Sequence, residues 1–179
     1  YFSIKVDNDL FFGTDRYYTS GIFLKYGNRL SIDSLKLNKK TTTKHFTLGQ
    51  KINTPSLRYT KDLKKIDYPY NGWLFIKYKK KTFYSNYKGY SIGFQIGTTG
   101  DDESLSKPMQ NLYHKYILDL PSLPWTSHQP QSFHFNFITE YYNGLKFNDN
   151  INLLSQSEFY LGSYESYFGT RLGFQFGRI

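Results

Sequence analysis

The chain has 179 residues, a formal net charge of +9 and an aromatic content of 20%. That aromatic content excludes intrinsic disorder, and the absence of cysteine excludes disulfide bonds, thiolate metal sites and cysteine nucleophiles. No apolar run approaches the roughly 18 residues of a membrane helix, but a mean hydropathy of −0.60 is compatible with a membrane β-barrel, whose strands alternate apolar and polar residues.

Apolar and polar residues alternate along eight segments, which we predict to be β-strands. In chain order these segments are Phe2–Asp9, Thr19–Leu30, Phe46–Ile52, Gly72–Lys80, Tyr87–Gly97, Ser132–Tyr142, Asn152–Leu161 and Tyr167–Gly177. The pattern is clearest in Tyr87–Gly97, Ser132–Tyr142 and Tyr167–Gly177, where one face is aromatic and aliphatic and the other carries Gly, Ser, Gln, Asn and an occasional charge. This pattern, with tyrosines at the strand ends, favours an all-β, antiparallel transmembrane β-barrel over the alternative of a soluble barrel with an aromatic core.

One segment has helical spacing instead. Pro108 suits a first helical turn, Ser106 is a candidate N-cap, and Pro121 ends the pattern, so we predict a loop helix near residues 106–120. Its apolar residues fall on one face, and Gln110, Asn111 and His114 fall on another. A single helix among strands indicates a functional loop.

Basic residues are concentrated in one part of the chain. The segment from Lys25 to Lys88 holds 16 of the 23 basic residues and only three acidic ones. Such a cluster can face nucleic acid, an anionic membrane surface or a phosphorylated ligand, and the alternative is an ordinary solvated surface.

Two places carry residues suited to chemistry. Asp9, beside Asn8, ends the first strand, and Thr19 begins the second, so a hairpin would bring them to one site, which we expect on the lumen side. Carboxylate and amide oxygens suit Ca²⁺, although Asn8 and Asp9 read equally well as turn residues. The second place is His114, a candidate general base if the neighbouring amides orient it, or otherwise a solvent-facing helix histidine.

Three motifs occur in the order found in a known family. They are D-N-D-L with T-D-R-Y-Y-T-S-G, then Q-K-I-N-T-P with D-Y-P-Y-N-G-W-L, and later Q-N-L-Y-H. Together the motifs, which cover most of residues 1–129, resemble the lipid A 3-O-deacylase (LpxR-type) family. The resemblance implies a twelve-stranded outer-membrane barrel, of which this chain, taken as one domain over residues 1–179, would be the N-terminal part.

The resemblance also implies site residues. Asn8 and Asp9 become the site pair of the first strand, Thr19 the hydroxyl residue of the second, and His114 the base on the loop helix. The family is calcium-dependent, which implies Asp9 as a metal ligand.

At one position the chain departs from the family pattern. The family has a glutamate shortly after the histidine, where this chain has Leu120 with Asp119 beside it. We therefore expect Asp119 to be the second Ca²⁺ ligand. The family's W-x-x-Q is one residue longer here, between Trp125 and Gln129, whereas Asp67, Tyr70, Gly72 and Trp73 match a motif that we interpret as structural.

The function that follows is an esterase of the bacterial outer membrane that removes a 3′-linked acyl chain from lipid A, with no nucleic-acid partner. In this hypothesis, His114 takes a proton from water, Ca²⁺ stabilises the oxyanion, and lysines between Lys36 and Lys65 contact the lipid A phosphates. The alternatives are a calcium-dependent phospholipase-like esterase, a non-catalytic lipopolysaccharide-binding or structural barrel, and a basic soluble β-protein that binds nucleic acid.

Overall fold

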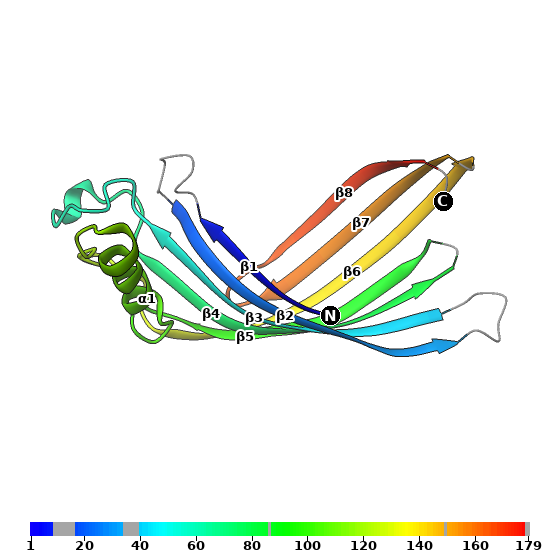
Figure 1. The fold of residues 1–179 in the computed structure, drawn as a ribbon, viewed down its shortest axis with the longest axis horizontal. Helices are drawn as coiled ribbons and strands as arrows, with labels where there is room; N and C mark the ends of the chain where they lie inside the picture. Colours follow the sequence, from blue (N-terminus) through cyan, green and yellow to red (C-terminus); the bar gives the residue numbers. More distant parts are fainter. Residues whose placement is uncertain (9–16, 34–39, 86, 149, 178–179) are drawn as a thin grey trace.

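The computed structural model describes residues 1–8, 17–33, 40–85, 87–148 and 150–177. Eight antiparallel strands form one sheet in which each strand pairs with its neighbours in sequence (Figure 1). They are β1 (Phe2–Asn8), β2 (Tyr17–Asp33), β3 (Lys40–Thr54), β4 (Asn71–Tyr84), β5 (Gly89–Thr99), β6 (Ser132–Asn148), β7 (Ile151–Gly162) and β8 (Tyr167–Phe176). The sheet is curved into a half-barrel whose two edges are β1 and β8. The predicted all-β fold of eight antiparallel strands is confirmed.

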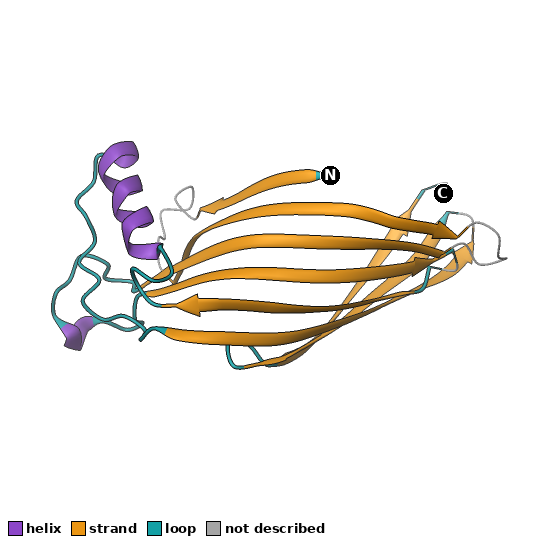
Figure 2. Ribbon diagram, turned by 90° about the horizontal axis from the view of Figure 1, so that it is seen from below, coloured by secondary structure: helices purple, strands orange, loops and turns teal. Residues whose placement is uncertain are grey.

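The predicted loop helix is also confirmed. Helix α1 (Ser106–Tyr113) continues into one π-helical turn, η3 (His114–Leu118), and stands at one end of the strands (Figure 2). A short 3₁₀ turn, η2 (Leu63–Lys65), lies in the loop between β3 and β4. None of the helices that the structure describes has the length and apolar character needed to span a bilayer.

The two faces of the sheet differ as the alternation predicts. In β5, Tyr90, Ile92 and Phe94 are 40–50% exposed, whereas Ser91 and Gln95 are 1% exposed. Because side chains alternate between faces, the exposed aromatic and aliphatic residues share one face, which we call the outer face. The opposite, concave side is the inner face. A soluble barrel with an aromatic core would have the reverse arrangement, so that alternative is wrong.

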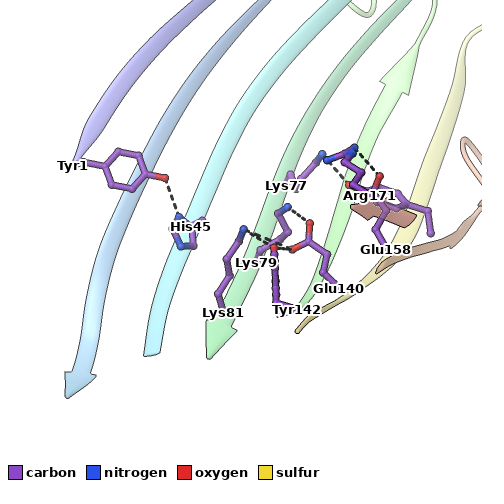
Figure 3. Close-up of polar contacts among 10 residues, drawn as sticks. Tyr1, His45, Lys77, Lys79, Lys81, Glu140, Tyr142, Glu158 and Arg171 are labelled. Atoms are coloured by element: carbon purple, nitrogen blue, oxygen red, sulfur yellow. Dashed lines mark hydrogen bonds and ion pairs between the residues drawn. The ribbon is translucent and has the colours of Figure 1, made fainter. Parts of the chain in front are cut away.

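The inner face carries a network of charges (Figure 3). Glu140 is 4% exposed and pairs with Lys79 at 2.7 Å and with Lys81 at 3.7 Å. Tyr142 donates its hydroxyl to the same carboxylate at 2.7 Å. Nearer the edge β8, Arg171 pairs with Glu158 at 2.8 Å, although the Arg171 side chain is 70% exposed. Ion pairs on the inner face therefore connect β4 to β6 and β7 to β8 and stabilise the sheet.

Candidate active site

A pocket of about 1000 Å³ lies between the helix and the ends of β1, β2 and β3 that are nearest to it. Its apolar walls come from both sides and comprise Val6, Ile22, Ile52, Met109, Leu112, Tyr113, Tyr116, Ile117 and Leu118. Its polar side chains include Asn8, Thr19, Gln50, Gln110 and His114. The pocket thus brings together three of the four residues expected to be catalytic.

Asn8 reaches the pocket from the outer face of the sheet. It is the last residue of β1 and pairs with Ser20 of β2. Every second residue of a strand points to the same face, so the Asn8 side chain projects on the same side as Phe2, Ile4 and Val6, which are 63–65% exposed. The expectation of a site on the lumen side is therefore wrong, because the pocket opens on the apolar face.

A β-bulge turns Thr19 toward the same pocket. The register between β2 and β3 shifts from Tyr18↔Asn53 to Ser20↔Ile52, which leaves Thr19 as an extra residue. A bulge of this kind re-aims the side chain of the extra residue. Thr19 is 5% exposed, and its hydroxyl lies 2.6 Å from that of Thr54, which is fully buried. Strict alternation would have placed Thr19 on the inner face with Gly21.

His114 is buried where α1 passes into η3. Its side chain is 3% exposed, which makes the alternative of a solvent-facing histidine wrong. Its Nδ1 atom lies 3.3 Å from the carbonyl oxygen of Pro121. Burial lowers the pKa of His114, the carbonyl contact partly opposes this, and the positive charge of Arg58 lowers the pKa further. The imidazole is therefore held neutral and ready to accept a proton.

Two features of the sheet anchor the helix over the pocket. Gln50 donates to the carbonyl oxygen of Ser104 at 2.9 Å and to the hydroxyl of Ser106 at 3.1 Å. Gly72 provides room for these serines, because a Cβ atom at this position would collide with both hydroxyls. Ser106 is therefore a docking residue and does not serve as the predicted N-cap, a position taken by Leu105 at φ 58° with no side-chain bond.

Sequence reasoning missed Gln50, although a signal was present. Phe46 and Leu48, at 44% exposure each, share the outer face of β3 with Gln50 and Ile52. A glutamine in an apolar row indicates a partner on that side of the sheet. In the neighbouring family motif, Tyr70 and Trp73 are at most 1% exposed, which supports the interpretation of these two residues as structural.

Of the two expected Ca²⁺ ligands, only Asp119 lies within the described residues. Asp9 lies outside the described residues. Asp119 is the exposed C-cap of the helix, at φ 52°, and directly follows the pocket residue Leu118. Within the described ranges, no group of three or more His, Asp or Glu residues could hold a metal ion. The oxygens of Asn8 and Thr19 nevertheless have the hard donor chemistry that Ca²⁺ prefers, so the residue types at the site fit this ion.

The lysines of the basic segment do not form one surface. Lys36 and Lys39 lie outside the described residues. Lys40 begins β3, and Gln50, near the other end of this strand, contacts the helix. At about 3.3 Å per residue, Lys40 lies roughly 33 Å along the strand from Gln50 and so far from the pocket, whereas Lys64 and Lys65 are in η2 at the helix end. The expectation that lysines between Lys36 and Lys65 contact the lipid A phosphates stays a prediction, and for a lipid bound in the pocket it favours Lys64 and Lys65 over Lys40.

Comparisons with known proteins agree with this architecture. No curated protein matches the chain. The chain is similar in structure to LpxR from Salmonella typhimurium, with a TM-score of 0.73 at 20% sequence identity. The match covers 96% of this chain and 62% of that one. The model of the outer membrane protein LpxR family matches residues 1–179, so this chain belongs to the LpxR family of outer membrane proteins.

Proposed function

We propose that the pocket is the active site of an outer-membrane esterase that hydrolyses a 3′-linked acyl chain of lipid A. The observation that carries this proposal is the protonation state of His114, which lines the same pocket as Asn8 and Thr19. A carbonyl oxygen only accepts hydrogen bonds, so the bond to Pro121 requires the proton of neutral His114 to lie on Nδ1. The Nε2 atom then keeps its lone pair, which is what a general base needs.

The reaction we propose uses this lone pair. Nε2 of His114 takes a proton from a water molecule while the water oxygen bonds to the ester carbonyl carbon. When the bond from that carbon to the sugar oxygen breaks, Nε2 returns the proton to the leaving oxygen. The products are a free fatty acid and a sugar hydroxyl, and Asn8 and Thr19 orient the reacting groups through hydrogen bonds.

The residues proposed to hold Ca²⁺ are Asp9 and Asp119. When bound, the ion would supply Lewis-acid stabilisation of the negative charge that develops on the ester carbonyl oxygen. Asp9 directly follows the pocket residue Asn8 and Asp119 directly follows the pocket residue Leu118, which supports their assignment.

The pocket walls support a lipid substrate. Met109, Leu112 and Ile117 from the helix face Val6 and Ile22 from the sheet across the pocket. An acyl chain buried among such side chains gains about 0.8 kcal/mol for each CH₂ group removed from water. Because the pocket opens on the outer face, an acyl chain can enter it without crossing the strand wall.

Mass spectrometry of lipid A from cells that express the protein tests the proposal. We expect loss of the mass of a 3′-linked acyl group with the wild type and none with H114Q. H45Q is the matched control, because His45 lies on the inner face, where it contacts Tyr1 at 2.9 Å. Full deacylation by H114Q would overturn the mechanism. An assay with phospholipid and lipid A side by side distinguishes the two esterase hypotheses, because a phospholipase-like esterase would release fatty acid from the phospholipid. Lipid A that binds to the protein but stays unmodified would indicate a non-catalytic barrel.

A further inference from the structure

The chain turns back along the helix directly after η3. Asp119 adopts a left-handed conformation at φ 52°, and the Leu120 amide donates to the carbonyl oxygen of His114 at 2.9 Å. Residues 120–125 then return beside the polar side of the helix, and we call them the return segment. The helix residues Gln110, Asn111 and His114 each form a hydrogen bond to this segment.

Asn111 binds the middle of the return segment at both of its amide atoms. Its Oδ1 accepts from the backbone amide of Leu123 at 2.7 Å, and its Nδ2 donates to the Leu123 carbonyl oxygen at 3.4 Å. Leu123 is itself 3% exposed and belongs to a buried cluster with Ile52, Tyr70 and Trp125. The segment is thus fixed from the helix by hydrogen bonds and from the sheet by apolar packing.

Fixing the return segment at Leu123 also determines where Pro121, two residues earlier, is placed. Its carbonyl oxygen is the partner of His114 Nδ1, and its position depends on where the return segment is held. The tautomer of a neutral imidazole is set by the hydrogen bond that its other nitrogen makes. Without a fixed acceptor at Nδ1, the proton is free to move to Nε2, and the lone pair needed for catalysis is lost there.

We infer that Asn111 is a positioning residue that holds the return segment so that His114 keeps its proton on Nδ1. The structural part of this inference stands on the contacts themselves, and its catalytic consequence rests on the proposed function. Gln110 supports the same segment, because its Oε1 accepts from the indole nitrogen of Trp125 at 3.1 Å.

The experiment measures the tautomer directly, on the full protein in detergent micelles with ¹⁵N-labelled histidine. The ¹⁵N shifts of His114, assigned by its absence in H114Q, distinguish Nδ1–H from Nε2–H at a pH where the ring is neutral. We expect Nδ1–H in the wild type and a mixture of tautomers in N111A. N111D retains the acceptor for the 2.7 Å bond and is expected to restore Nδ1–H.

N136A is the matched control. Asn136 is fully buried, whereas Asn111 is half-buried, and its Oδ1 likewise accepts from backbone amides, those of Tyr164 and Glu165, but it lies in the strand β6, away from the helix. We expect its loss to leave the His114 tautomer unchanged. In deacylation assays, N111A is expected to lower kcat by roughly 10- to 100-fold, by analogy with the residues that orient metal-ligating histidines, with KM within a factor of two.

The outcomes separate the two proposals. If N111A keeps the Nδ1–H tautomer, or if N136A disturbs it as much as N111A does, the role of Asn111 is overturned. If the tautomer responds as expected but the wild type releases no fatty acid, the positioning role stands and the proposed function fails. If N111A does not fold, N111D decides, since an Nε2–H signal in that variant would contradict the inference.

Discussion

The two faces of the sheet carry polar residues of different kinds. On the outer face, the pocket side chains Asn8, Thr19 and His114 are neutral, and apolar walls surround them. On the inner face, Glu140 is paired with two lysines among further charges. The difference follows from what each face meets. Charge on the side that faces hydrocarbon costs several kcal/mol, whereas the inner face can pair its charges across strands. The general base proposed at the outer face, His114, is therefore expected to act in its neutral form.

The largest effect on stability is expected from E140A. The variant leaves Lys79 and Lys81 without their carboxylate, and their side chains are only 18% and 23% exposed. Breaking a buried ion pair from one side costs about 3–5 kcal/mol, so the urea midpoint in detergent should fall markedly. The matched variant is E158A, because its partner Arg171 is 70% exposed, and we expect at most about 1 kcal/mol there. Equal losses in the two variants would mean that the inner face is hydrated throughout.

A charge on the outer face is expected to cost somewhat less. Phe94 of β5 is 40% exposed on this face, and F94K should destabilise the protein by about 2–4 kcal/mol in lipid vesicles. F94L keeps the side chain apolar and serves as the control. A loss of the same size in F94L would contradict the assignment of the faces.

The neutral base predicts a pH dependence for the proposed reaction. Burial lowers the pKa of His114 below its ordinary value of 6.5. Because the base acts when unprotonated, kcat/KM should fall as the pH drops through the lowered pKa, so the midpoint of the acidic limb should lie below pH 6.5, with a tenfold fall for each further unit. A profile from about pH 4 to 8 measures this. An acidic limb centred at or above 6.5 would show that His114 is either exposed or not the base.

The sequence was informative where one local pattern determines the structure. Alternation alone placed the Tyr90 row on the outer face, and helical spacing located the helix from Ser106 onward. Asn8 and Gln50, which alternation puts in the apolar rows, did carry a signal for the side of the sheet on which the pocket lies. The entry of Thr19 into the pocket was not predictable, because it depends on a bulge in the pairing between β2 and β3. The burial of His114 depends on the return segment, whose contacts join residues that no local pattern connects.

The smallest expected effect tests that bulge. Thr54 is fully buried and its hydroxyl lies 2.6 Å from that of Thr19, so T54V removes this partner and keeps the side-chain shape. A lost hydrogen bond of this kind is worth about 0.5–1.5 kcal/mol, which corresponds to roughly a 2- to 13-fold fall in deacylation if Thr19 orients the reacting groups. T42V is the matched control, since Thr42 of the same strand is 6% exposed and contacts Thr82 in a similar threonine pair at 3.5 Å. Both variants should lose similar stability, but only T54V should slow the reaction. An equal or absent effect on rate in the two variants would mean that Thr19 braces the strands without contributing to catalysis.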